Sequence, residues 1–97
     1  MASRAYEAMI ILNPNEAEAD LKTATQRISD QISARGGQVE KVDTWGRRRM
    51  YYPIKHVHDG HYVVYSFQAE PTAIRELEAN WKLADDVLRH LVIRKGE

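Results

Sequence analysis

The side chains best suited to chemistry lie in one short run, Gly46-Arg47-Arg48-Arg49-Met50-Tyr51-Tyr52-Pro53-Ile54-Lys55. Guanidinium groups keep their charge in proteins, so consecutive arginines require water or anionic partners. Guanidinium planes and tyrosine rings also pair with phosphates and stack on bases. We therefore expect a strand, kinked or edge-placed at Pro53, that presents a basic and aromatic surface of a kind suited to RNA. The alternative is an edge strand whose charges only prevent aggregation.

A second cluster of reactive side chains contains His56, His58 and His61. The dipeptide Asp59-Gly60 is typical of a hairpin turn, so His61 is expected across the turn from the other two histidines. A zinc site needs several ligands that converge on the metal. We therefore interpret the histidines as exposed turn residues and expect no metal and no other cofactor.

Length and charge limit how such a surface can work. The 97 residues suffice for one hydrophobic core, so we expect a single domain spanning residues 1–97. The 14 basic and 14 acidic residues cancel, and there is no cysteine for a disulfide or a thiolate metal site. Bulk positive charge therefore does not drive RNA binding, which must come from segregated charge or from a partner that supplies the rest.

Hydrophobic periodicity predicts the elements that position these residues. In chain order they are a strand over 4–12, a helix over 16–35, a strand over 39–55, a strand over 62–69, a helix from Pro71 and a strand over 87–94. Gly36-Gly37 ends the first helix. Trp81 lies on the apolar stripe of the second helix, where we expect it to be a core anchor.

The alternation within each strand predicts which side chains are buried. We expect the parity of Tyr6 to face the core in the first strand and that of Phe67 to do so in the third. In the last strand we expect the parity of Val87, Arg89, Leu91 and Ile93 to point inward.

The order βαββαβ predicts an α+β, ferredoxin-like fold, in which a four-stranded antiparallel sheet carries two helices on one face. The opposite sheet face is then open, and it contains Met9, Ile11, Tyr62 and Val64. Monomers seldom expose a contiguous apolar patch of this kind without using it. We therefore expect these four residues to form an interface with a protein partner.

Catalytic patterns are missing from the sequence. No serine lies in a Gly-x-Ser-x-Gly elbow, and no glycine-rich loop resembles a phosphate-binding loop. Acylphosphatase-like enzymes have this fold class but need an arginine in a glycine-rich loop after the first strand, where this chain has Asn13-Pro14-Asn15. We therefore expect a protein that is not an enzyme.

The basic run closely resembles a motif of the bacterial small-subunit ribosomal protein six family. That motif has Gly, any residue, a basic and a polar residue, Leu, a small residue, Tyr, Pro, Ile and a polar or basic residue. Met50 replaces the usual Leu at similar volume, and Tyr51 replaces the usual small residue. The resemblance covers nearly the whole chain, including Tyr6-Glu7 through Asn13-Pro14-Asn15, Thr44-Trp45-Gly46, His61-Tyr62-Val63 and, in part, residues 85–89.

The resemblance implies a cytoplasmic ribosomal protein that acts in translation. It implies a heterodimer with ribosomal protein eighteen of the small subunit, joint binding to the central domain of the small-subunit (16S) rRNA, and a role in platform assembly. We expect the RNA contacts to reach the phosphate backbone, which positions a protein without selecting sequence. The candidate side chains are Arg4, Arg47, Arg48, Arg49, Lys55, Arg89 and Arg94.

Two other classes of protein have the same predicted fold. The first is a regulatory module that forms a homodimer through its open face and binds a small ligand. The second is an enzyme that uses the histidines, which predicts stoichiometric metal in the purified protein. The mass of the free protein, its metal content and its bound nucleic acid distinguish these classes from a ribosomal protein.

Overall fold

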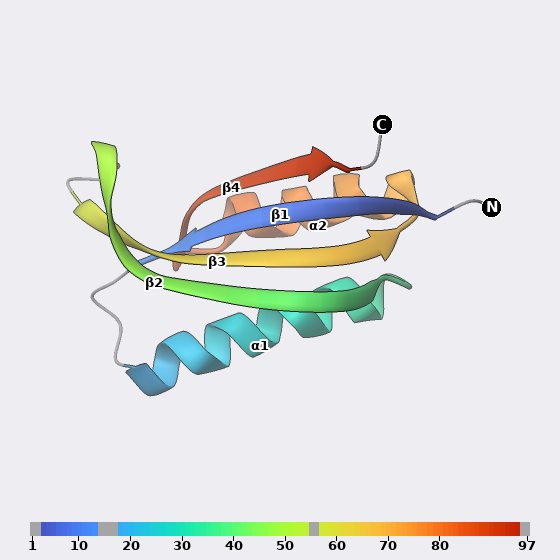
Figure 1. Ribbon diagram of the computed structural model, residues 1–97, viewed down its shortest axis with the longest axis horizontal. Coiled ribbons are helices and arrows are strands. Elements are labelled where there is room, and N and C mark those ends of the chain that lie inside the picture. The colour runs from blue at the N-terminus through green and yellow to red at the C-terminus, as the bar shows by residue number, and fades with distance from the viewer. Residues whose placement is uncertain (1–2, 14–17, 55–56, 96–97) are drawn as a thin grey trace.

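A computed structural model describes residues 3–13, 18–54 and 57–95 of the chain. Its elements are β1 (Arg4–Leu12), α1 (Glu18–Ala34), β2 (Gln38–Ile54), β3 (Val57–Ala69), α2 (Pro71–Leu83) and β4 (Val87–Arg94). The strands form one antiparallel sheet in the order β2-β3-β1-β4. Both helices cover the same face of this sheet (Figure 1). The fold is therefore the ferredoxin-like arrangement that the element order predicts.

The core lies between the sheet and the two helices, and the predicted parities of β1 and β3 are confirmed. The side chains of Tyr6, Ala8, Ile10, Leu12, Val63, Tyr65, Phe67 and Ala69 are at most 7% exposed. Helix α1 adds Ala24, Ile28 and Ile32, and helix α2 adds Ala73, Leu77 and Trp81. Trp81 is 1% exposed, so it is the predicted core anchor. Each large apolar side chain buried in this way contributes about 1.5–3 kcal/mol.

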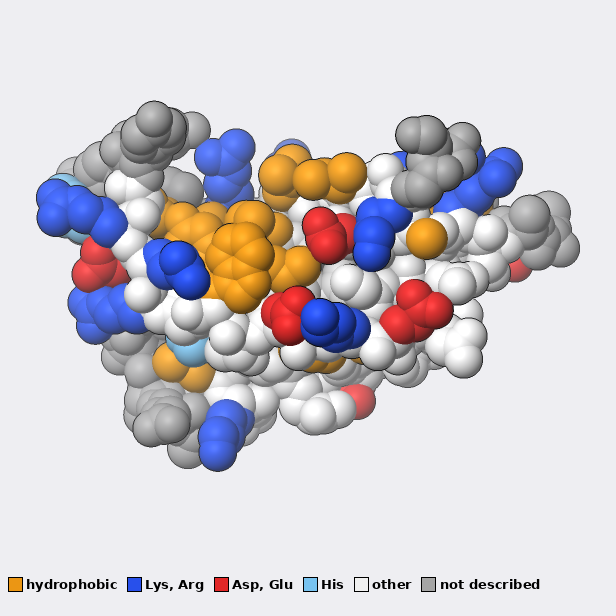
Figure 2. Space-filling view, viewed as in Figure 1, with side chains coloured by type: hydrophobic (Ala, Val, Ile, Leu, Met, Phe, Trp, Pro, Cys, Tyr) orange, Lys and Arg blue, Asp and Glu red, His pale blue; other side chains and the backbone are white. Residues whose placement is uncertain are grey.

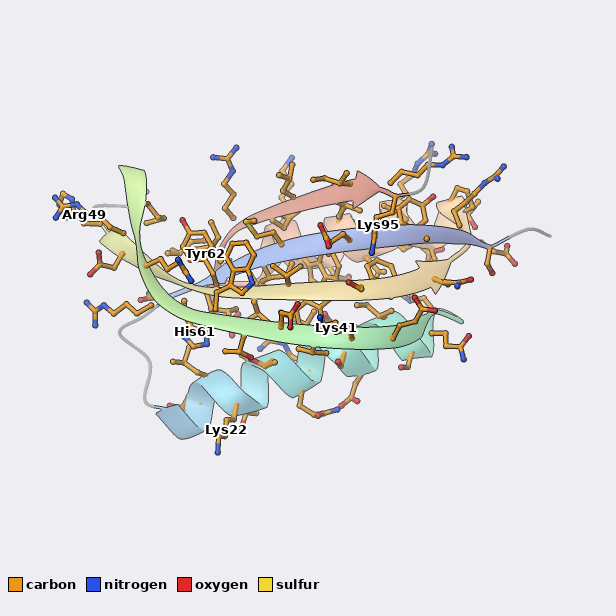
Figure 3. All side chains as sticks on the ribbon, in the orientation of Figure 1. Lys22, Lys41, Arg49, His61, Tyr62 and Lys95 are labelled. Atoms are coloured by element: carbon orange, nitrogen blue, oxygen red, sulfur yellow. The ribbon has the colours of Figure 1, made fainter. Side chains whose placement is uncertain are left out.

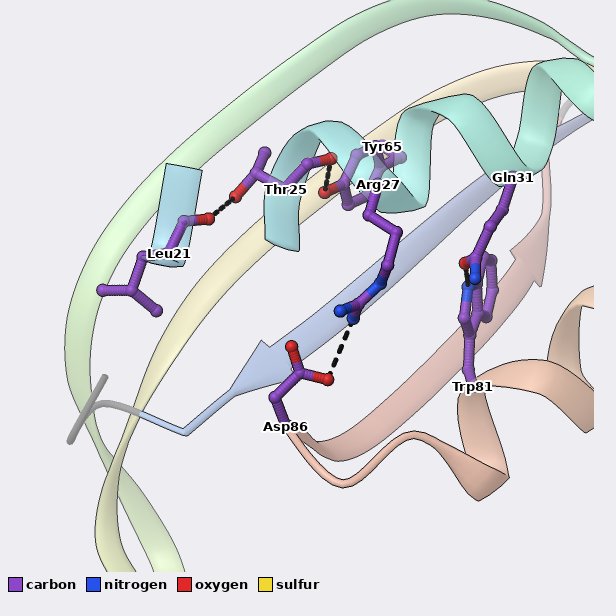
Figure 4. Close-up of polar contacts among 7 residues, drawn as sticks. All are labelled: Leu21, Thr25, Arg27, Gln31, Tyr65, Trp81 and Asp86. Atoms are coloured by element: carbon purple, nitrogen blue, oxygen red, sulfur yellow. Dashed lines mark hydrogen bonds and ion pairs between the residues drawn. The ribbon is translucent and has the colours of Figure 1, made fainter. Parts of the chain in front are cut away.

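Three polar contacts fix α1 in place (Figure 4). The hydroxyl of Tyr65 donates a hydrogen bond to the carbonyl of Thr25 at 2.9 Å, and Trp81 Nε1 donates one to Gln31 Oε1 at 2.9 Å. Arg27 forms an ion pair with Asp86 at 2.9 Å. Burial raises the pKa of Tyr65 well above its usual value, and the charge of Arg27 opposes this only in part.

The C-terminus of α1 and the N-terminus of α2 follow the predicted chemistry. Gly36 has a φ of 81°, and its N–H donates to the carbonyl of Ser33 at 3.0 Å. A residue without Cβ adopts this conformation freely, so α1 ends there. Pro71 begins α2, where its missing N–H costs no helical hydrogen bond.

The predicted inward face of β4 is wrong beyond Val87. Leu12 pairs with Val87 but Ile11 pairs with Arg89, so Leu88 is an extra residue in the strand. Such a bulge moves every later side chain to the opposite face. Leu91 and Ile93 are therefore 46% and 50% exposed on the open face, while Val92 packs against the core.

The predicted turn at Asp59-Gly60 is also wrong. Asp59 pairs with Arg49 and Gly60 pairs with Arg48, so both residues lie inside β3. Only residues 55 and 56 separate β2 from β3 in the sequence, which places the connection there and His56 outside the described residues. The hairpin is longer than the dipeptide rule predicts because Asp59 and Gly60 serve packing and charge pairing instead.

The far ends of β2 and β3 pair only with each other, since β1 reaches no further than His61 in its pairing with β3. We call this part of the hairpin, residues 48–54 and 57–60, the arm; in Figure 1 its β2 strand bends away from the line of the sheet. Met50 in the arm is 8% exposed and Ile11 in β1 is 7% exposed. A Cβ added to Gly60 would overlap Ile11 Cγ2 and would lie 3.6 Å from Met50 Sδ. The missing side chain at Gly60 therefore lets the arm pack against β1.

We expect Gly60→Ala to lower the free energy of unfolding by about 1–3 kcal/mol, because the added methyl group overpacks this contact. The measurement is urea-induced unfolding of a double-mutant cycle with Ile11→Ala, which removes the atom that the new Cβ would overlap. The cost of Gly60→Ala should shrink in the Ile11→Ala background. An equal cost in both backgrounds would contradict the proposed contact.

We expect Tyr65→Phe to lower the free energy of unfolding by about 0.5–1.5 kcal/mol at neutral pH, because it removes the hydrogen bond to Thr25.

The pH dependence of stability gives a second prediction. Above about pH 10 the side chain of Tyr65 ionises in the unfolded chain. It stays protonated in the fold, because burial raises its pKa. The free energy of unfolding of the unchanged protein should therefore fall with rising pH, by at most about 1.4 kcal/mol per unit from this group. The free energy of unfolding of Tyr65→Phe should decrease less steeply with pH, as measured by urea titrations at successive alkaline pH values. Parallel curves for the variant and the unchanged protein would contradict this prediction.

Candidate nucleic-acid and partner interface

The four residues predicted for a protein interface lie together on the open sheet face. Met9 pairs with Val64 and Ile11 pairs with Tyr62 across β1 and β3. Ile11 and Val64 are only 7% and 6% exposed, so they offer little surface, while Met9 and Tyr62 are half-buried. Ile11 is buried because the arm covers it at Gly60.

The open face nevertheless keeps an apolar depression. Its lining consists of Met9, Ile11, Tyr62, Arg89, His90 and Leu91, and its volume is about 190 Å³. We call it the open-face groove. Leu91 belongs to it because the bulge at Leu88 turns the outer part of β4 toward this face. The groove therefore extends further toward β4 than the four predicted residues do, and its lining includes Arg89.

Trp45 is the aromatic residue that the sequence prediction missed. It is 45% exposed, and its ring is nearly parallel to that of Tyr62, at 6° with centroids 6.4 Å apart. The guanidinium carbon of Arg48 lies 5.3 Å from the Trp45 ring centroid, within the range of a cation–π contact. Figure 3 labels Tyr62, which lies on the open face of the sheet. We call these three side chains the Trp45 stack.

The three consecutive arginines have three different surroundings. Arg47 donates from Nε to Asp59 Oδ2 at 3.1 Å, across the hairpin. Arg48 lies against Trp45. Arg49 is exposed and has no ion pair or hydrogen bond with any described residue. Lys55, the fourth cation predicted here, lies outside the described residues.

The remaining predicted cations divide between two ends of the sheet. Arg89 pairs with Ile11, at the end near the arm, whereas Arg94 pairs with Tyr6 and Arg4 pairs with Ala69 at the other end. At ~3.3 Å per residue along a strand, Arg89 and Arg94 are separated by roughly 17 Å. All three side chains are exposed, and the space-filling view has Lys and Arg side chains toward both ends (Figure 2). The predicted RNA-binding set is therefore two groups rather than one.

Other kinds of site find no support in the part of the chain that the structure describes. No three His, Cys, Asp or Glu side chains within residues 3–13, 18–54 and 57–95 converge on a position for a metal ion. His58 is exposed, and His61 is half-buried opposite Arg47. Within the same residues, neither helix has the length and apolar character of a membrane span.

Strand irregularities hid the missed residues from the sequence pattern. Thr44 pairs with Val63 and Gly46 pairs with Tyr62, so Trp45 is an extra residue in β2. Gly46 has a φ of 83°, a conformation that favours glycine at a bulge. A Trp directly before a Gly inside an apparent strand was the one available signal of this irregularity.

Comparison with known proteins identifies the family. A family model described as Ribosomal protein S6 matches residues 5–94. Small ribosomal subunit protein bS6 of Desulforamulus reducens is 38% identical over 94 residues, which span 97% of this chain and 99% of that protein. The protein of the same name from Streptomyces coelicolor is 43% identical over 91 residues, spanning 94% of this chain and 95% of that protein.

Solved structures agree with this assignment. The crystal structure of 30S ribosomal protein S6 from Thermotoga maritima superposes with a TM-score of 0.91 at 29% identity, covering 97% of this chain and 89% of that chain. The C-terminal domain of the MgtC protein from Mycobacterium tuberculosis, at 12% identity and a TM-score of 0.65, shares the fold alone. The chain therefore belongs to the ribosomal protein S6 family, as a structural, non-enzymatic component of the small ribosomal subunit that is cytoplasmic with the ribosome.

Proposed function

We propose that the chain binds the central domain of the small-subunit (16S) rRNA together with ribosomal protein eighteen of the same subunit, and that the pair supports platform assembly. The proposal rests on one observation: apolar and basic side chains occupy separate parts of the surface of a chain whose formal net charge is zero. Apolar surface gathers on the open face, while the candidate RNA-binding arginines lie toward the arm and at the opposite end of the sheet.

The open-face groove is the surface proposed for the protein partner. Met9, Tyr62 and Leu91 give it an apolar lining, and Ile93 extends the apolar surface along β4. An interface of this composition gains affinity by removing apolar surface from water. The partner is proposed to be basic, because the complex then neutralises more phosphates than this chain does alone.

The arm is the surface proposed for the RNA backbone. Arg49 is the cation best placed for a phosphate, since no described residue pairs with it. Arg47 contributes less, because Asp59 neutralises its charge at 3.1 Å. Arg4 and Arg94 lie too far along the sheet to contact the same phosphates as the arm, so they are proposed as a second contact.

The deciding experiment measures binding of the full chain to a central-domain rRNA fragment across a salt series, with and without ribosomal protein eighteen. The proposal predicts tight, salt-sensitive binding only when the partner is present. Tight binding by the chain alone would refute the need for the partner. No binding in either mixture would refute the rRNA proposal.

We expect Arg49→Gln to weaken rRNA binding by the complex and to reduce the salt slope by about 1, since one phosphate contact is lost. We expect Asp59→Asn to act in the opposite direction, because it frees the charge of Arg47. Both effects are measured as Kd against salt concentration. The matched control is Arg75→Gln in α2, on the helical side of the sheet, which removes the same charge and should change neither quantity. An effect of Arg75→Gln equal to that of Arg49→Gln would show that net charge alone matters.

We expect Met9→Asp to weaken binding of ribosomal protein eighteen at least about 10-fold, because a carboxylate would be buried without a partner at the interface. The control is Leu83→Asp, which adds the same charge at a side chain that is 82% exposed at the end of α2. Calorimetric titration of each variant with the partner measures the effect, and circular dichroism checks the fold. Unchanged affinity of a folded Met9→Asp variant would remove the open-face groove from the interface.

A further inference from the structure

Trp45 is an exposed aromatic residue that the contacts proposed above do not include. An exposed tryptophan ring costs free energy in water, yet 45% of Trp45 remains accessible, whereas Trp81 is 1% exposed. The bulge at Trp45 and the positive φ of Gly46 determine the position of this ring. The backbone irregularity therefore places a large aromatic surface at the boundary between the sheet and the arm.

Two side chains of the Trp45 stack hold the indole ring in one orientation. Tyr62 lies parallel to it at a centroid distance of 6.4 Å, and Arg48 approaches it at 5.3 Å. In the space-filling view the largest group of hydrophobic side chains on this face lies beside Lys and Arg side chains, over the end of the sheet toward the arm (Figure 2). An aromatic ring that is fixed by a second ring loses little further entropy when a third planar group stacks on it.

The charged side chains near Trp45 indicate which kind of ligand would stack on its ring. Arg48 lies 5.3 Å from the ring centroid on the open-face side of β2. Arg49 follows it in the strand, so its side chain projects to the opposite face, and it has no partner among the described residues. A planar group attached to a negatively charged chain satisfies both the aromatic surface and these cations. The open-face groove lies on the other side of Tyr62, toward β1 and β4, so the two surfaces adjoin without coinciding.

We propose that the exposed surface of Trp45 stacks an unpaired base of a single-stranded RNA segment, whose phosphates contact Arg48 beside the ring and Arg49 on the opposite side of the strand. This inference rests on the proposed function only in taking RNA as the ligand. It adds a base contact to an interface otherwise built from backbone contacts. Stacking of this kind tolerates any base, because every base has a planar π surface.

The test compares two short oligomers of equal length at low ionic strength. One is an unstructured oligouridylate, and the other is an abasic ribose-phosphate oligomer with the same number of phosphates. The oligouridylate should quench the emission of Trp45 and bind roughly 10-fold more tightly than the abasic oligomer. Trp81 should not respond, because it is buried and its Nε1 is bonded to Gln31.

Variants of Trp45 separate stacking from charge. Trp45→Leu should bind the oligouridylate no more tightly than the abasic oligomer, while Trp45→Phe should keep most of the difference. Arg49→Gln should weaken both oligomers by the same factor, since it removes only a phosphate contact. Thermal unfolding followed by circular dichroism checks that each variant folds.

Three results would overturn the inference. The first is equal affinity of the unchanged chain for both oligomers. The second is the absence of quenching by the oligouridylate at any concentration. The third is a Trp45→Leu variant that loses affinity for ribosomal protein eighteen but not for the oligouridylate, which would make the ring a protein contact. None of these results depends on the rRNA-fragment experiment, so the two proposals fail separately.

Discussion

The close packing of Gly60 against Ile11 determines the shape of the functional surface. Because Gly60 has no side chain, the arm approaches β1 until Met50 and Ile11 are both buried. The packed arm then has a fixed position relative to the groove beside it. The arginines of β2 therefore extend from a hydrogen-bonded hairpin rather than from an irregular loop, which lowers the entropy cost of binding.

The sequence predicted the fold because both helices and the inner parts of β1 and β3 keep regular periods. Tyr6 and Phe67 have the predicted parity, and Trp81 is buried on its predicted stripe. Errors arose wherever one residue was added to a strand, since a single bulge reverses the parity of all that follows. Leu88 reversed β4 in this way, and nothing in its neighbours' side chains marks the extra residue.

The candidate site was predictable by residue type but not by surroundings. The run of arginines identified the end of the molecule that we propose for RNA, yet only the register of the hairpin assigns Asp59 to Arg47. The rule that Asp-Gly forms a turn failed here, because tertiary packing at Gly60 outweighs local turn preference. Trp45 was missed because the function of a bulge residue depends on its partner across the sheet, Tyr62.

The zero net charge of the chain and the positions of its cations together determine how selectively it can bind RNA in the proposed complex. A uniformly basic chain of this size would bind many RNA sequences, since counterion release is insensitive to sequence. Here the candidate RNA-binding arginines lie toward the two ends of the sheet, and Arg47 is already neutralised by Asp59. In the proposed complex, affinity therefore depends on a geometry that presents both groups at once, together with apolar surface between them. Such a surface favours a folded RNA and a matching partner over charge alone, because only a specific complex contacts all of its parts.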